Sequence, residues 1–169
     1  TFVLNNAYAG TDTEYSNFVF KVYNTEKFLK ILSLQDAEVL VNGKKISNDN
    51  YHAKMQGNVA QISLRAMLEA FGSEVTWKDE EQAIMFTCGE DRYKFRLNEY
   101  GVTEHSDILV STAGGEYEPV FWRAEKLYYK MIDDRVIIWE GMAVDRFSKI
   151  FEKRAKMDYD KLTIDFVDI

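Results

Sequence analysis

The segment from Ile62 to Trp77 constrains the fold more than any other stretch of the chain. Four of its apolar residues follow helical spacing and form one stripe: Leu64, Met67, Leu68 and Phe71. Ser63 stands where a hydroxyl can cap the first turn, and Gly72 stands where helices commonly end in a residue with positive φ. Val75 and Trp77 then alternate with polar residues. The segment therefore predicts a short amphipathic helix, a glycine stop and a strand.

The residues that follow predict an antiparallel meander. Ala83–Cys88 is apolar and typical of a strand, and Gly89–Asp91 favours a turn. Arg92–Leu97 alternates, which places Tyr93, Phe95 and Leu97 inward and leaves Arg92, Lys94 and Arg96 on a solvated face. Trp77 and Trp139 each end a predicted strand, and we expect both indoles in the core.

A second segment, Glu118–Met131, repeats this order in degenerate form. Val120, Ala124, Leu127 and Tyr128 follow helical spacing, and Pro119 suits a first helical turn. Asp133-Asp134 predicts a turn and Arg135–Trp139 a strand. Tyr128 stands where the first copy has Gly72, so this helix must end differently. The shared order of helix, strand, turn and strand predicts an internal duplication.

Two motifs together resemble a known family. Val39-Leu-Val-Asn-Gly-Lys-Lys45 followed by the Ile62–Trp77 segment resembles the copper amine oxidase N-terminal-like domain over residues 36–141. Ser63 replaces the proline usual in that family, whereas Pro119 retains it in the second copy. The resemblance implies a small α+β stalk domain found in exported and surface proteins of Gram-positive bacteria. It also implies that copper and the quinone cofactor belong to a separate, larger catalytic domain.

The flanking residues complete the predicted organisation. Residues 1–35 form an N-terminal extension, in which 1–9 is either the remnant of a signal peptide, ending in Ala7-Tyr-Ala9, or an ordinary first strand. Asn17–Tyr23 predicts a strand. Residues 142–169 predict an amphipathic helix over Met142–Met157 and a final strand over Lys161–Ile169, packed on the same domain. The predicted class is α+β: an antiparallel sheet with two short helices from the duplication, then the C-terminal helix and strand.

Composition excludes several classes of function. A net charge of −7 disfavours nucleic-acid binding, which depends on neutralising phosphates. No apolar run is long enough to span a membrane. The chain has two histidines and one cysteine, Cys88, so neither a copper site built from several imidazoles nor an internal disulfide is expected. We assign no catalytic residue, no metal ligand and no cofactor.

Three aromatic residues of the second segment are the candidate ligand-binding residues. Trp122 and Tyr129 lie off the apolar stripe of the predicted helix, and Tyr117 precedes it. Exposed rings of this kind can stack on sugar faces, although packing against the terminal extensions is the alternative. We expect a non-catalytic, exported or cell-surface module that acts as a binding domain or as a spacer. Its expected partner is cell-wall polysaccharide or a surface protein. The alternative is a hydrolase-like enzyme whose site the sequence does not reveal, and the oligomeric state stays open.

Overall fold

The computed structural model describes residues 2–4, 18–20, 33–46, 52–57, 59–103, 107–120, 127–139 and 142–169. The chain divides into two compact units, residues 1–33 and residues 34–169. In the first unit, β1 (Phe2–Leu4) pairs antiparallel with β2 (Phe18–Phe20). β1 thus lies within residues 1–9, for which the sequence predicts either a signal-peptide remnant or a strand.

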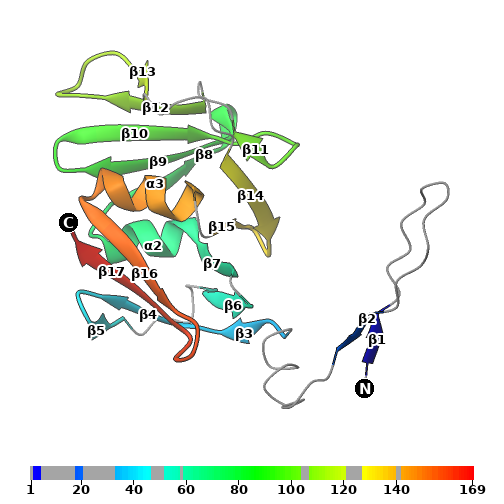
Figure 1. Ribbon diagram of the computed structural model, residues 1–169. Coiled ribbons are helices and arrows are strands. Elements are labelled where there is room, and N and C mark those ends of the chain that lie inside the picture. Colours follow the sequence, from blue (N-terminus) through cyan, green and yellow to red (C-terminus); the bar gives the residue numbers. More distant parts are fainter. Residues whose placement is uncertain are drawn as a thin grey trace. The chain divides into compact units, whose positions relative to one another are not determined.

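The second unit contains three sheets and two described helices (Figure 1). The five-stranded sheet has the order β13-β12-β10-β9-β8: Glu118–Pro119, Ile108–Ser111, Asp91–Arg96, Ala83–Cys88 and Val75–Lys78. The six-stranded sheet has the order β11-β14-β15-β7-β6-β3: Val102–Thr103, Leu127–Ile132, Arg135–Trp139, Val59–Ser63, Lys54–Gln56 and Gln35–Asp36. The four-stranded sheet has the order β16-β17-β4-β5: Lys153–Asp158, Thr163–Asp168, Glu38–Val41 and Lys44–Lys45.

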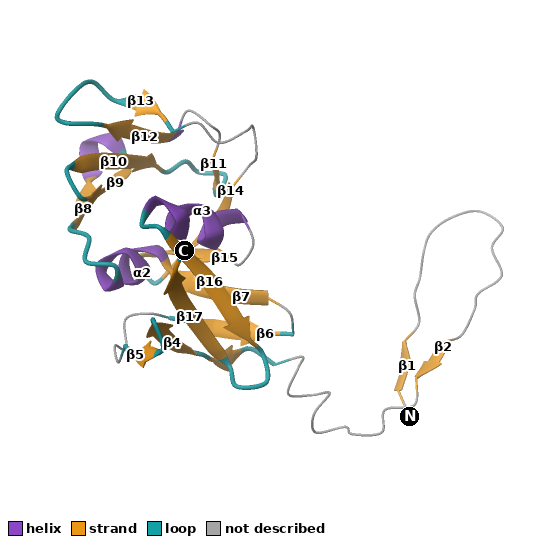
Figure 2. Cartoon of the chain, turned by 60° about the vertical axis from the view of Figure 1, so that its left-hand side comes forward, coloured by secondary structure: helices purple, strands orange, loops and turns teal. Residues whose placement is uncertain are grey.

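The helices are α2 (Leu64–Ala70) and α3 (Met142–Ile150). Both views place them between the five-stranded and the four-stranded sheets (Figure 2). The antiparallel sheets with helices confirm the predicted α+β class, and β8, β9 and β10 confirm the predicted meander.

The first helix follows its sequence signals closely. Ser63 Oγ accepts a hydrogen bond from the Ala66 amide at 3.5 Å, which satisfies one of the amides that the first turn leaves unpaired. Leu64, Met67 and Leu68 are fully buried, and Gly72 has a φ of +85° just beyond the helix end. Local spacing therefore sets this helix, and its stripe packs into the common core.

The predicted second helix is wrong where the structure describes it. Leu127 and Tyr128 lie in β14, which pairs with β11 and β15, while residues 121–126 fall outside the described residues. Along β14, Leu127 and Tyr129 are buried whereas Tyr128 and Lys130 are exposed, so period-2 alternation and strand pairing override the helical spacing. The Asp133-Asp134 turn and the strand after it are confirmed. The duplication itself stays a prediction.

The C-terminal helix is shorter than expected. α3 ends at Ile150, and Lys153–Asp158 forms β16 instead of continuing the predicted helix to Met157. Glu152 has a φ of +52°, which breaks the helical path, and β16 gains a full antiparallel partner in β17. β17 also pairs in parallel with β4, so the final strand lies inside its sheet.

The core joins segments from both ends of the second unit. Phe86 and Phe95 come from the meander, Phe147 from α3 and Phe166 from β17, and all four rings are at most 1% exposed. Phe147 packs on Phe95 with a centroid distance of 5.4 Å, and Phe166 packs on Phe71 at 4.9 Å. Residues 142–169 therefore belong to this core.

A cluster of polar side chains connects β17 to the β4–β5 turn through hydrogen bonds. The Asn42 side chain donates to Asp168 Oδ2 at 2.9 Å and accepts from the Asp168 amide at 3.0 Å. Lys153 also donates to the Asp168 carboxylate. The hydrogen bond from Lys153 is the largest cause that holds the pKa of Asp168 below its ordinary value, and the hydrogen bond from the Asn42 side chain is the next.

The Asp168 cluster predicts a specific acid sensitivity. Because the folded pKa is depressed, its stabilising contribution is complete above the ordinary aspartate pKa of about 3.9 and is lost as the pH falls through the folded value. We expect Asp168→Asn to lower the free energy of unfolding at neutral pH. The variant should also lose less of this free energy than the wild type as the pH falls. Urea unfolding between about pH 2 and pH 6 measures this dependence. If the free energy of unfolding of Asp168→Asn fell with decreasing pH just as that of the wild type does, the prediction would be contradicted.

Candidate functional site

The structure describes two of the three aromatic candidates from the sequence, Tyr117 and Tyr129. Trp122 lies outside the described residues. Tyr129 is 5% exposed, and its hydroxyl donates to the Asn98 carbonyl at 2.8 Å and accepts from the Asn98 amide at 2.6 Å. Burial raises the pKa of Tyr129. Tyr129 is therefore a core residue whose hydroxyl is hydrogen-bonded to the loop before β11. Its buried ring is not accessible for stacking on a ligand.

Tyr117 is half-buried and already has a partner. Its ring lies 4.5 Å from Lys94 Nζ, a cation–π contact, and the same ammonium donates to the Glu81 carboxylate. This hydrogen bond is the main cause that lowers the pKa of Glu81. Lys94 is only 9% exposed, so the expectation of three solvated cations on β10 is wrong at its central position. The aromatic contact and the ion pair thus both engage the buried Lys94 Nζ.

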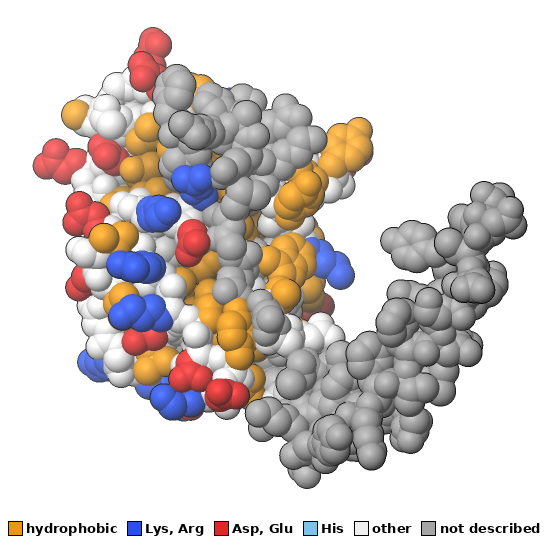
Figure 3. All heavy atoms as spheres, viewed as in Figure 1, with side chains coloured by type: hydrophobic (Ala, Val, Ile, Leu, Met, Phe, Trp, Pro, Cys, Tyr) orange, Lys and Arg blue, Asp and Glu red, His pale blue; other side chains and the backbone are white. Residues whose placement is uncertain are grey.

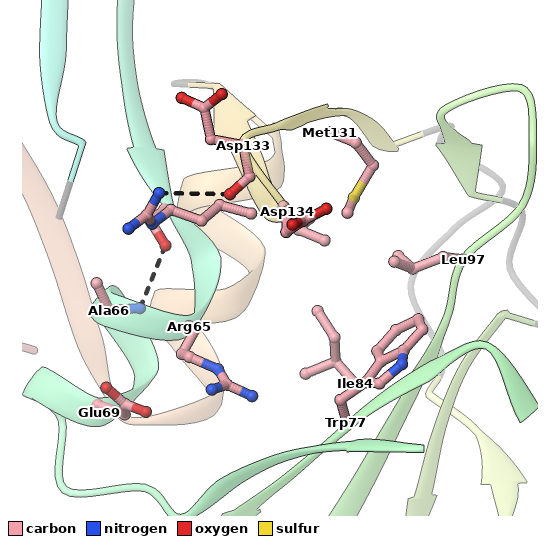
Figure 4. A pocket seen from close by; sticks show the side chains of 12 residues that line it. Arg65, Ala66, Glu69, Trp77, Ile84, Leu97, Met131, Asp133 and Asp134 are labelled. Atoms are coloured by element: carbon pink, nitrogen blue, oxygen red, sulfur yellow. Dashed lines mark hydrogen bonds between the residues drawn. The ribbon is translucent and has the colours of Figure 1, made fainter. Parts of the chain in front are cut away.

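A cleft of about 800 Å³ opens elsewhere, where α2 faces β8 and the β14–β15 turn (Figure 4). Its walls combine apolar and charged side chains from several elements. The lining residues are Ser63, Arg65, Ala66, Glu69, Trp77, Ile84, Leu97, Met131, Asp133, Asp134, Arg135 and Val136. A concave site with an apolar wall and a few polar groups is the usual form of a ligand pocket.

Trp77 supplies the largest flat surface of this cleft. It lies on β8, the edge strand of its sheet, and is 41% exposed, so the expectation of a core indole is wrong. Its Nε1–H donates to Asp79 Oδ1 at 3.3 Å, and the Gln82 side chain donates to the same oxygen at 3.2 Å. The 3-10 turn η1 (Asp79–Glu81) positions this acceptor. The hydrogen bond orients the indole at the cleft.

The opposite walls carry charges of both signs. Arg65 and Glu69 project from α2, and Asp133 and Asp134 form the β14–β15 turn, where both have positive φ (Figure 4). Arg135 donates to the Asp133 carbonyl at 3.3 Å, which closes the turn. The side chains of Arg65, Glu69, Asp133 and Asp134 form no ion pair with any other residue that the structure describes, whereas five lysines of the second unit do. Charged groups thus line the cleft without neutralising each other.

Comparison with known proteins gives a family match for one part of the chain. Residues 40–107 match the family model of the copper amine oxidase N-terminal domain. In copper amine oxidases this domain is a non-catalytic module. The match lies within the predicted range of 36–141 and ends before the segment proposed as a second copy. No curated protein and no solved structure gave a significant match.

The cleft crosses the boundary of this copper amine oxidase N-terminal domain match. Arg65, Glu69 and Trp77 lie within it, whereas Met131, Asp134 and Arg135 come from the hairpin beyond it. Strand alternation predicts a core position for Trp77, and the sequence shows no sign of a site at Arg65 or Glu69. The useful signal was the position of β8 at an edge of the sheet, which only the strand order reveals. Among the described residues, no helix is long and apolar enough to cross a membrane, and no cluster of three or more His, Cys, Asp or Glu could hold a metal.

Proposed function

We propose that the chain is a non-catalytic binding module of an exported, cell-surface protein and that its cleft binds cell-wall glycan. The observation that carries this proposal is the exposed, hydrogen-bonded Trp77 indole beside charged groups that lack partners in the described structure. The family match agrees with a binding or spacing role, since the matched domain is non-catalytic in copper amine oxidases.

The chemistry of the two walls suits a sugar. The apolar face of a pyranose packs on an indole, and the hydroxyl groups at its rim accept or donate hydrogen bonds. Arg65 offers a planar set of donors, and the carboxylates of Asp133 and Asp134 offer acceptors. Because Asp79 already holds the indole, little side-chain entropy is lost on binding.

The cleft predicts a large effect for one substitution. Trp77→Ala is expected to weaken binding of oligosaccharides released from purified cell wall by about tenfold, which corresponds to about 1.4 kcal/mol. Isothermal titration calorimetry on the full chain measures the dissociation constant. Trp77 is exposed, so the variant should retain the wild-type circular dichroism spectrum.

Tyr100→Ala is the matched control. Tyr100 is 79% exposed but does not line the cleft, so we expect its dissociation constant to stay within about twofold of the wild type. Arg65→Gln tests the polar wall and should weaken binding without changing the fold. If the wild type and Trp77→Ala bound the oligosaccharides with equal affinity, the cleft would not be the glycan-binding site. If no wall fraction binds while a surface protein does, the glycan assignment fails and the protein partner replaces it.

A further inference from the structure

The outer face of the six-stranded sheet carries a second group of accessible aromatic and polar side chains. One face of this sheet is the core, to which Met55, Ala60, Ile62, Tyr129 and Ile138 contribute buried side chains. Successive side chains in a strand point to opposite faces, so the residues next to these lie on the outer face. Tyr128 is 57% exposed there, and Trp139 is half-buried.

Strand register arranges these side chains in one row. Tyr128 is opposite Val102, Trp139 is opposite Gln61, and Lys54 is opposite both Gln61 and Asp36. The pairing of Tyr129 with Ile138 places Tyr128 opposite Trp139. The row therefore crosses all six strands in this order: Val102, Tyr128, Trp139, Gln61, Lys54 and Asp36. At about 4.8 Å for each strand, it spans about 24 Å.

The row is narrow and has available hydrogen-bonding groups. On one side it is bordered by Ile137 and Ser63, which are 1% and 2% exposed. The Tyr128 hydroxyl, the Trp139 indole N–H and the Gln61 amide have no hydrogen bond to any side chain or backbone group in the described part of the chain. In the space-filling view, hydrophobic side chains are exposed at several places between the charged ones (Figure 3). The accessible strip thus combines ring faces with donors and acceptors.

We propose that this row is a second binding site, independent of the cleft, and that it takes a linear, uncharged polysaccharide. Successive sugar rings of such a polymer repeat at a distance close to the spacing between neighbouring strands. Tyr128 and Trp139 offer stacking surfaces, and Gln61 offers both a donor and an acceptor to hydroxyl groups.

Charge selects the class of polymer. Lys54 Nζ lies 2.6 Å from Asp36 Oδ1, so the ionic end of the row is already neutralised. Among the described residues of this face, Lys130 is an exposed cation beside Tyr128, and Arg135 is half-buried and donates to the Asp133 carbonyl. These two cations are insufficient to draw a polyanion to a chain with a net charge of −7. A row about 24 Å long and one side chain wide, about 6.8 Å along the strands, presents on the order of 160 Å², well below the about 800 Å² that each partner buries in a standard protein interface. A neutral polysaccharide fits both constraints.

Sedimentation of the full chain with insoluble chitin and with insoluble cellulose tests the proposal. We expect binding to at least one of them, weakened about five- to tenfold by Tyr128→Ala and also weakened by Gln61→Ala. Tyr128 and Gln61 are preferred to Trp139 because they can be replaced without removing a half-buried ring. Ile169→Ala replaces a 71% exposed residue that follows β17, a strand of another sheet, and should bind as the wild type does.

Three results would overturn the proposal. They are no binding to either polysaccharide, binding that neither Tyr128→Ala nor Gln61→Ala changes, and a dimer that Tyr128→Ala dissociates in analytical ultracentrifugation. The last result would make a second copy of the chain the occupant of this face. None of these outcomes bears on the cleft, because the proposed cleft ligand is a soluble oligosaccharide and its test residue is Trp77.

Discussion

Replacing Phe166 by alanine is expected to lower the free energy of unfolding by about 3–5 kcal/mol. Phe166 is 0% exposed and packs edge-on against Phe71, the residue that ends α2. Its strand, β17, holds β16 on one side and β4 on the other, so the cavity would open between the C-terminal segment and the family-matched segment. Urea unfolding followed by tryptophan fluorescence measures the loss.

Ile169→Ala is the control for Phe166→Ala. Ile169 is in the same terminal segment but is 71% exposed, so its replacement should change stability by less than about 0.5 kcal/mol. A loss below about 1 kcal/mol for Phe166→Ala would mean that the final strand packs on the domain without supporting it.

Replacing Phe147 by alanine is expected to have an effect of similar size, about 3–5 kcal/mol. Phe147 is 0% exposed on α3, and its ring contacts Phe95 at 5.4 Å and Phe86 at 6.0 Å. The helix follows the family match in the chain, yet this ring fills the space against the meander. Differential scanning calorimetry should show a lower melting temperature for the variant.

Phe147→Leu separates volume from chemistry at this position. Leucine keeps most of the apolar volume, so we expect a smaller loss than alanine causes. Lys149→Ala, at an exposed position of the same helix, should leave the melting temperature unchanged within experimental error. If Phe147→Ala were as stable as Lys149→Ala, α3 would not belong to the core.

Features that depend on local chemistry were predictable from the sequence. Ser63, the apolar stripe after it and Gly72 define α2 within ten residues of chain, and the Asp133-Asp134 turn follows from its own residue types. The strands β9 and β10 follow from clean alternation between turn residues. In each case the local preference and the tertiary environment agree.

Features that depend on distant pairing were not predictable. Leu127 and Tyr128 satisfy helical spacing, but β11 and β15 supply strand partners on both sides. Lys153–Asp158 carries helix-compatible residues, but β17 pairs with it along its full length. Trp77 follows the alternation of a core strand, yet β8 lies at the edge of its sheet. Sequence periodicity contains no information about which strand has a neighbour.

The same reason explains the outcome for the candidate site. Helical spacing predicts an exposed helix face for Trp122 and Tyr129, whereas the strand β14 buries Tyr129. The cleft combines Arg65 of α2 and Trp77 of β8, which are 12 residues apart, with Asp134 from a hairpin 57 residues further along the chain. Its formation requires α2 and the β14–β15 turn to face the same sheet edge.

The ¹H–¹⁵N spectrum of the full chain, titrated with soluble cell-wall oligosaccharides, tests the central claim most directly. The chain has three tryptophans, so three indole N–H signals report separately on Trp77, Trp122 and Trp139 once tryptophan-to-phenylalanine variants assign them. The glycan-binding cleft predicts a saturable shift of the Trp77 signal, whose N–H donates to Asp79 at the cleft wall. A titration in which the Trp77 signal stays fixed at every oligosaccharide concentration would contradict it.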